Sequence, residues 1–347
     1  MPKILVINSS QGKNRLLMNA FKELEQKDFS FDLLSAKNPW LGQFKFLFLL
    51  INFRLKQKVD LVVCVNFNEK IVITPAARLL GLKVVWLENP ELDCRGFNKF
   101  LLALYKLNYR LAKTVVFNNY SKLKLKNIGC AENKINLIPP GAKLMAYQEN
   151  IFNKLAIAGR ANFHRSYFTI GAITALNQKQ KIETIFQAIK ISLPVIPNIQ
   201  LIIIGEGEER KNLAWLAKKM EIDNLIWLVG EQEQLKKWLG SFDVFLSLGE
   251  NLSLDDYGAI LEAMAAGLPV LAPRNMGLED LIIENSTGLL IESDNSEMLS
   301  RQIIKLHQNK RLRLYLGKNG QERVSRLFTM EIMVEKLAQI FSLSLQA

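Results

Sequence analysis

Residues Leu254–Pro273 read LDDYGAILEAMAAGLPVLAP, and this stretch predicts a helix, a turn and a strand in succession. Its first part has the apolar spacing of a helix. Gly267-Leu268-Pro269 then turns the chain into a short apolar run that is typical of a buried strand. One carboxylate, Glu262, stands in the middle of the otherwise apolar helix. Burial of a carboxylate among apolar residues costs free energy unless something binds it, so Glu262 is a candidate ligand-binding residue.

Short runs rich in Val and Ile alternate with longer segments of helical periodicity throughout the 347 residues. This alternation is typical of doubly wound parallel sheets, and the length predicts two α/β domains. We expect a Rossmann-like domain over residues 1–150, a polar linker over about 143–166, a second Rossmann-like domain over 165–330 and a final helix over 331–347. Two such domains predict a ligand at the carboxyl ends of both sheets, in a cleft between the domains.

Positive charge concentrates in the first half of the chain. Residues 1–160 hold 25 Lys and Arg against 11 Asp and Glu, whereas residues 161–347 hold 20 against 22. A basic half suits nucleic acid, anionic lipid or a phosphorylated substrate. No helix-turn-helix, zinc-finger or RNP-like pattern accompanies the charge, so we expect no nucleic-acid partner.

The cysteines and the first residues of the sequence indicate a cytoplasmic protein. Cys64, Cys94 and Cys130 are odd in number and form no CxxC pair, which favours reduced thiols and predicts neither a disulfide framework nor a zinc site. The opening MPKILVINSSQGK has no basic n-region followed by a long apolar run, so it does not resemble a signal peptide.

The run IQLIIIGEGEERKNL predicts a strand, a glycine turn and a helix. Gly205 and Gly207 match the start of a dinucleotide-binding fingerprint, but Arg210 stands where the third glycine belongs. A tight strand-to-helix turn explains the glycines without any ligand. We keep Gly205 as a candidate donor-binding position.

The segment YGAILEAMAAG predicts a helix whose first turn contains Gly258. A glycine there lets a phosphate approach backbone N–H groups that have no helical partner, where the helix dipole also favours negative charge. Glu262 lies one turn further along the same face. Its carboxylate can accept two hydrogen bonds from a ribose, so the pair predicts a site for a nucleoside diphosphate.

Four segments resemble the donor-binding domain of retaining GT-B glycosyltransferases of family 4 (glycosyl transferases group 1) in their order and spacing: GAILEAMAAGLPVLAP, LIIIGEGEERKNL, NLIWLVGEQEQLKKWLGSFDVFLSLGE and STGLLIESDNSEMLSRQI. The resemblance covers Phe168 to about Phe341, and INLIPPGAKL is similar to the family's entry to its interdomain linker. It implies a GT-B fold with an N-terminal acceptor-binding and a C-terminal donor-binding domain, and a final helix that packs back on the first domain.

The activity implied by the resemblance is that of a hexosyltransferase-type glycosyltransferase. Such an enzyme moves a sugar from a nucleotide-diphosphate donor, with retention at the anomeric carbon, to a glycan or lipid-linked acceptor in cell-envelope or exopolysaccharide synthesis. Positioning and charge stabilisation of the departing diphosphate are the main demands of this chemistry, so we expect no metal or other cofactor.

The resemblance assigns donor-site roles by position. Glu262 resembles the glutamate that holds the nucleotide ribose, and Glu231 after Gly230 belongs to the turn that reads the base. Lys179 or Lys181 would neutralise the diphosphate. The backbone cradle of the distal phosphate corresponds to Tyr257, Gly258 and Ala259.

Two family residues are replaced in this chain. Leu254 stands where the first glutamate is expected, with Asp255, Asp256 and Glu250 as the nearest substitutes, of which we select Asp255 as a donor contact. Gly171-Ala172 stands where the family has Gly-Arg, and Gly171 remains a candidate donor contact. These losses leave open a catalytically idle GT-B scaffold or partner subunit; a sugar epimerase of the same build is a further alternative.

Two positions in the first half are candidates for contact with sugar or acceptor. Glu88 follows the strand KVVWLE, where an acid can assist at the sugar; a solvated acidic loop explains it equally well. Gly12, in the loop after the first strand, offers backbone N–H groups to donor or acceptor.

Two segments, WLGQFKFLFLLINFRLKQK and GFNKFLLALYKLNYRLAK, mix aromatic and leucine residues with Lys and Arg. This composition is typical of helices that lie on an anionic membrane surface, although core helices with basic edges fit it as well. Neither segment has the roughly 18 unbroken apolar residues that a membrane span requires. We therefore expect peripheral contact of the basic N-terminal domain with the inner face of the cytoplasmic membrane.

Overall fold

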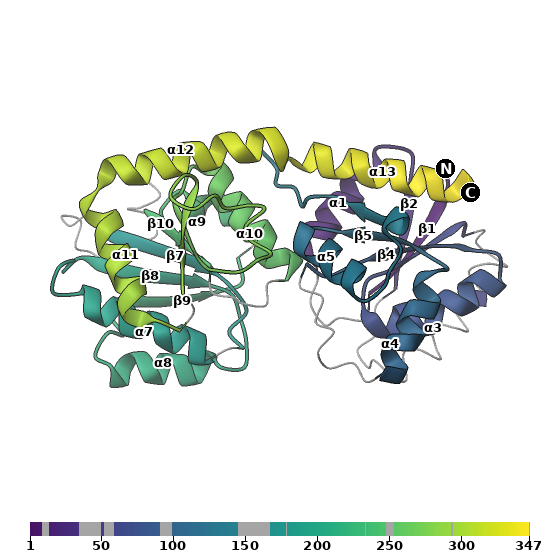
Figure 1. The fold of residues 1–347 in the computed structure, drawn as a ribbon. Coiled ribbons are helices and arrows are strands. Elements are labelled where there is room, and N and C mark those ends of the chain that lie inside the picture. The colour runs from purple at the N-terminus through teal and green to yellow at the C-terminus, as the bar shows by residue number, and fades with distance from the viewer. Residues whose placement is uncertain are drawn as a thin grey trace. The chain divides into compact units, whose positions relative to one another are not determined.

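The computed structural model describes residues 1–8, 14–34, 50–51, 59–90, 99–144, 167–177, 179–232, 234–247, 253–292 and 294–346. The chain divides into two compact units, each built on one six-stranded parallel sheet with helices on both faces (Figure 1). The first unit comprises Met1–Gly141, Ser253–Asp255 and Met330–Ala347; the second comprises Ala142–Leu252 and Asp256–Thr329. The prediction of two doubly wound parallel-sheet domains is confirmed. Most of the expected linker lies outside the described residues.

The sheet of the first unit has the strand order β2-β1-β3-β4-β5-β6. Its strands are β1 (Lys3–Ile7), β2 (Ser30–Leu34), β3 (Leu61–Cys64), β4 (Lys83–Leu87), β5 (Lys113–Val116) and β6 (Ile135–Leu137). The helices of this unit are α1 (Arg15–Glu25), α3 (Phe67–Leu79), α4 (Lys99–Tyr109), α5 (Asn119–Asn127), the 3₁₀ turn η1 (Glu132–Lys134) and α13 (Met330–Gln346).

Alternate residues of each strand in the first unit supply two separate cores. Ile4 and Val6 of β1 pack with α1 and α13, whereas Leu5 and Ile7 pack on the opposite face with α3 and α4. Successive side chains of a strand point to opposite faces, and both faces of this sheet are covered. This is why the strands are continuous apolar runs instead of alternating apolar and polar residues.

The sheet of the second unit has the order β12-β11-β10-β7-β8-β9. Its strands are β7 (Phe168–Ile173), β8 (Ile199–Ile204), β9 (Ile226–Gly230), β10 (Val244–Leu246), β11 (Val270–Pro273) and β12 (Gly288–Ile291). The described helices are α7 (Lys179–Ser192), α8 (Arg210–Lys219), α9 (Leu235–Leu239), α10 (Leu254–Ala265, whose first two residues belong to the first unit), α11 (Ser296–Gln308) and α12 (Lys310–Leu327).

The Gly-Leu-Pro turn that follows α10 is shaped by glycine. Gly267 has φ +75°, a left-handed conformation that ends the helix. Gly317 of α12 packs directly on this turn, since a Cβ at position 317 would lie 1.9 Å from the Gly267 carbonyl oxygen. The Gln321 amide, one turn further along α12, donates to the Ala265 carbonyl at 2.9 Å. The turn thus holds α12 against the end of α10.

Within the described ranges, no helix is both long and apolar enough to cross a membrane.

Candidate functional site

The strand order of the second unit reverses between β7 and β10. In an open parallel sheet, ligands bind outside the carboxyl ends of the strands at such a switch point. β8 and β9 lie on one side of this point, and β10, β11 and β12 lie on the other. The loops that follow these strands are therefore the candidate functional site of this unit.

The loops after β7 and β8 interlock through their backbones. Gly205 has φ +148°, and a Cβ there would lie 1.9 Å from the Thr174 carbonyl oxygen. A Cβ at Gly207 would lie 2.3 Å from the Asn177 side-chain oxygen. The Leu176 N–H donates to the Glu206 carbonyl at 3.0 Å, which ties the two loops together. The glycines that resemble a dinucleotide fingerprint thus have a steric explanation, and donor binding at Gly205 stays a prediction.

Arg210 occupies the place of the fingerprint's third glycine and joins two loops. Its guanidinium pairs with Glu206 at 2.8 Å and donates to the Leu228 carbonyl of β9 at 2.6 Å. β9 ends at Gly230, which has φ +79°, and a Cβ there would lie 2.8 Å from a Glu206 carboxylate oxygen. Glu231 follows with an exposed side chain. The turn that resembles the base-reading turn is therefore held by Arg210 and Glu206.

Gly171 and Ala172 lie inside β7 instead of in the loop after it. A Cβ at Gly171 would lie 2.0 Å from the Phe242 ring, so packing alone requires glycine there. Ala172 is fully buried in the apolar core on the other face of the sheet. Ala172 therefore packs in the core of this unit, and a donor contact of Gly171 stays a prediction.

Helix α10 begins at Leu254, earlier than the sequence interpretation placed it. The first turn holds Asp255 and Asp256, and acidic residues there are favoured by the helix dipole. Gly258 consequently lies in the second turn, where backbone N–H groups are engaged in helical hydrogen bonds. The expectation that Gly258 stands in the first turn is wrong. A phosphate contact of Tyr257, Gly258 and Ala259 stays a prediction, but their amides are not the unpaired ones of this helix.

The Asp255 carboxylate accepts a hydrogen bond from the Leu16 backbone N–H at 3.0 Å, and both residues belong to the first unit. Leu16 lies in the first turn of α1, where N–H groups have no helical partner. The carboxylate therefore caps α1. A donor contact of Asp255 stays a prediction, and Glu250 lies outside the described residues.

Glu262 is the exception on an otherwise buried stretch of α10. Its neighbours on both sides along the chain, residues 259–261 and 263–265, are at most 2% exposed, whereas the Glu262 side chain is only partly buried. The apolar setting expected from the sequence is confirmed. Full burial of a carboxylate costs free energy, and the partial exposure of Glu262 avoids most of this cost.

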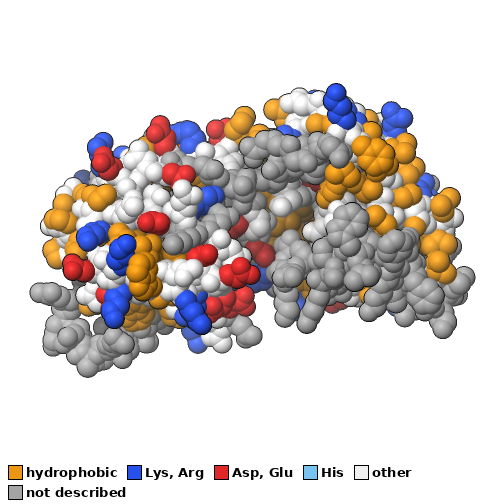
Figure 2. All heavy atoms as spheres, turned by 90° about the horizontal axis from the view of Figure 1, so that it is seen from below, with side chains coloured by type: hydrophobic (Ala, Val, Ile, Leu, Met, Phe, Trp, Pro, Cys, Tyr) orange, Lys and Arg blue, Asp and Glu red, His pale blue; other side chains and the backbone are white. Residues whose placement is uncertain are grey.

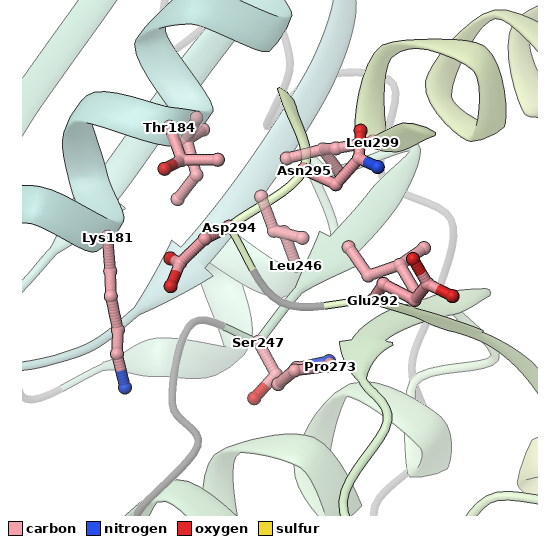
Figure 3. Close-up of a pocket in the computed structure, with 11 residues that line it drawn as sticks. Lys181, Thr184, Leu246, Ser247, Pro273, Glu292, Asp294, Asn295 and Leu299 are labelled. Carbon is pink, nitrogen blue, oxygen red and sulfur yellow. The ribbon is translucent and has the colours of Figure 1, made fainter. Parts of the chain in front are cut away.

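A pocket of about 40 Å³ opens at the carboxyl ends of β10, β11 and β12 (Figure 3). Leu246, Ile185 and Leu299 contribute apolar surface, and Ser247 and Pro273 lie at the strand ends. The Lys181 and Asp294 side chains reach along one side of the pocket, and the Glu292 carboxylate lies on the other side. The structure thus brings Lys181 to the carboxyl edge. The side chain of Lys179 is outside the described residues.

In the first unit, Glu88 lies in a buried polar cluster. Its side chain is 1% exposed, pairs with Lys70 of α3 at 3.0 Å and accepts a hydrogen bond from the Tyr105 hydroxyl of α4 at 2.8 Å. A solvated acidic loop is therefore the wrong interpretation of Glu88. A role of this carboxylate at the sugar stays a prediction, and the cluster ties the end of β4 to two helices.

Lys70 was not among the predicted site residues. No local pattern marks it, because its partner Glu88 lies 18 positions further along the chain. The helix start is set by a capping box, in which the Glu69 carboxylate accepts from the Asn66 backbone N–H at 3.0 Å. This start orients Lys70 toward the sheet, where it is 2% exposed.

The two cysteines that the structure describes are buried thiols. Burial, and next the nearby Glu69 carboxylate, raise the pKa of the Cys64 thiol far above its ordinary value. A thiol that stays protonated is a poor nucleophile and a poor metal ligand. The described part of the chain also contains no cluster of His, Cys, Asp and Glu that could hold a metal ion. Gly12 and Cys94 lie outside the described residues.

Residues 154–323 match the protein family described as "Glycosyl transferases group 1". Among curated proteins, the chain is 27% identical over 147 residues to the lipopolysaccharide core biosynthesis glycosyltransferase LpsE of Rhizobium meliloti, which is 42% of this chain and 43% of that protein. It is 24% identical over 319 residues to the capsular polysaccharide biosynthesis glycosyltransferase CapM of Staphylococcus aureus, which is 83% of this chain and 80% of that protein. The first of these matches thus spans less than half of the relative.

Among solved structures, the chain resembles Anabaena HepE in complex with UDP and glucose, with a TM-score of 0.82 at 17% sequence identity over 99% of this chain and 100% of that one. Sequence-based and structural comparisons therefore agree with the two parallel-sheet units described above. The chain has the GT-B fold, and residues 154–323, which cover most of its second unit, match the family Glycosyl transferases group 1.

Proposed function

We propose that this chain is a glycosyltransferase that transfers a sugar from a nucleotide-diphosphate donor to a glycan or lipid-linked acceptor in cell-envelope polysaccharide synthesis. The family match over the second unit supports a transferase. LpsE and CapM, which the chain resembles, are named for lipopolysaccharide core and capsular polysaccharide biosynthesis. HepE, whose fold the chain shares, is described with UDP and glucose.

Glu262 is the observation that carries the proposal. It is the partly exposed carboxylate on a stretch of α10 whose neighbouring residues are buried, in the helix that follows the strand at the switch point. A carboxylate accepts two hydrogen bonds from vicinal hydroxyls in a charge-assisted geometry. We assign Glu262 to the ribose of the donor.

We assign Lys181 to the diphosphate of the donor, since its side chain brings a positive charge to the carboxyl edge of the same sheet. In a transfer that retains the anomeric configuration, the departing diphosphate gains negative charge, and a fixed lysine stabilises this charge without a metal. The proposal therefore includes retention and no metal cofactor, with Lys181 in the electrostatic role.

A donor screen tests the proposal. Purified protein is titrated calorimetrically with UDP, GDP and ADP, and nucleotide release is followed from the corresponding sugars. We expect one base to bind, and its sugar nucleotide to be hydrolysed slowly without an acceptor. Binding without release would mean that an acceptor is needed, and a polyprenyl-linked or glycan primer is then added. A protein that binds no nucleotide would contradict the proposal and favour an idle scaffold.

A further inference from the structure

Helix α4 in the first unit presents an exposed face that combines apolar and basic side chains. Phe100 is 69% exposed, Leu107 61% and Leu111, just beyond the helix end, 38%. The opposite side of the helix is anchored in the unit by three buried residues, Tyr105, Asn108 and Tyr109. Their spacing of seven and four residues places these exposed apolar side chains on one side of the helix, and we call them the apolar strip.

A row of positive charges borders this strip. Lys99, Lys106 and Arg110 are all exposed, and their spacing of seven and four residues places them along one edge of the helix, with Arg110 in the turn directly after its end. None of the three forms an ion pair with another residue in the described ranges. We call these six residues, Phe100, Leu107, Leu111, Lys99, Lys106 and Arg110, the α4 face.

Figure 2, which views the side of the first unit that carries α4, shows hydrophobic side chains gathered there with Lys and Arg at the border. Exposed Phe and Leu side chains lose contact with water when they insert at the boundary of a lipid bilayer. Basic side chains beside them are attracted by anionic headgroups. The excess of Lys and Arg over residues 1–160 acts in the same direction.

We propose that the α4 face docks this chain on an anionic phospholipid surface. The apolar strip enters the headgroup region, and the basic row lies against the lipid phosphates. Charge complementarity selects this occupant, because three cations beside an apolar strip match a negatively charged interface. The inference goes beyond the donor chemistry and does not depend on it, since docking is measured without any nucleotide.

Sedimentation of the full chain with vesicles tests the docking. Vesicles of phosphatidylcholine mixed with an equal part of phosphatidylglycerol are compared with vesicles of phosphatidylcholine alone. We expect sedimentation with the anionic vesicles only, and release as the ionic strength rises from about 0.01 M to about 1 M, which shortens the range of charge interactions tenfold. Equal binding to neutral vesicles, or no binding to either, would overturn the proposal.

Two pairs of matched variants localise the docking. Lys99→Gln/Lys106→Gln/Arg110→Gln should weaken binding to anionic vesicles about 100-fold. Lys211→Gln/Lys218→Gln/Lys219→Gln removes the same charge from exposed positions of α8 in the second unit and should change binding less than threefold. Phe100→Ser/Leu107→Ser should weaken binding at least about tenfold, whereas Trp215→Ser, at a position as exposed as Leu107, should not.

Equal losses in both triple variants would mean that net charge, and not the α4 face, binds lipid. The conservative change Phe100→Leu should retain binding, which separates loss of the apolar contact from damage to the fold. Thermal unfolding of each variant within error of the parent confirms that the exposed positions are tolerated.

Discussion

The Lys70 ammonium lies 3.0 Å from a Glu88 carboxylate oxygen, and both side chains are at most 2% exposed. Tyr105 donates its hydroxyl to the same carboxylate, so the group joins α3, α4 and the end of β4. The charge of either partner is uncompensated once the other is removed. The pair therefore decides how the carboxyl edge of the first unit is held together.

Removal of one partner should be strongly destabilising. Glu88→Gln leaves the Lys70 charge buried and unpaired, and we expect a loss of about 3–5 kcal/mol in the free energy of unfolding of the first unit. Lys70→Met/Glu88→Gln, which removes both charges, should recover most of that loss. Urea unfolding followed by tryptophan fluorescence measures both, since Trp86 is buried beside Tyr105.

The exposed pair Lys3–Asp32 is the control, because its side chains are 30% and 35% exposed. Lys3→Met should cost less than about 1 kcal/mol. If Glu88→Gln were as stable as the parent and yet slow in sugar transfer, Glu88 would act at the sugar instead of in the cluster.

Gly205→Ala should destabilise the second unit by both strain and collision. The φ of +148° costs an alanine about 1–3 kcal/mol, and the new Cβ would lie 1.9 Å from the Thr174 carbonyl oxygen. Gly267→Ala is the matched control, since it has φ +75° and its nearest neighbour would be 3.9 Å away. Calorimetric melting temperatures should fall clearly more for Gly205→Ala; equal decreases would show that the loops after β7 and β8 do not interlock.

Glu262→Gln should weaken binding of the nucleotide selected by the donor screen. Charge-assisted hydrogen bonds contribute about 1.5–3 kcal/mol each, so the dissociation constant should rise at least about tenfold and transfer should fall about 100-fold. Isothermal titration and nucleotide release measure the two effects.

Glu322→Gln serves as the control for Glu262→Gln, because Glu322 is a mostly exposed acid on α12 in the same unit. It should leave binding unchanged. Full binding by Glu262→Gln would mean that this carboxylate is a surface residue of α10 and that the donor lies elsewhere on the unit.

Cys64 should resist alkylation while the protein is folded. Burial raises the pKa of its thiol, so the reactive thiolate is scarce in the native state even at pH 9, where an exposed cysteine is half ionised. Iodoacetamide labelling followed by peptide mass spectrometry should modify Cys64 only after the addition of denaturant. Rapid native labelling would show that the space between β3 and α3 opens to solvent.

Local pattern predicted much of the second unit correctly. Apolar runs and helical periodicity are patterns among residues that are close in the chain, so the sequence was enough to predict two parallel sheets. The burial of the residues that flank Glu262 was predictable for the same reason, since their apolar character is read directly from the sequence. The start of α10 was placed too late because Asp255 and Asp256 can serve either a loop or a first helical turn.

Patterns among neighbouring residues were enough to predict the alternation of strands and helices and the carboxylate on α10. Contacts between distant segments, in contrast, pair Lys70 with Glu88, require glycine at position 205 beside Thr174, and bury Ala172 in the core. These relationships join residues 18 or more positions apart or depend on which face of a strand is covered. Helical and strand periods repeat within a few residues, whereas the partner of a buried charge and the space beside a glycine are created when distant segments pack.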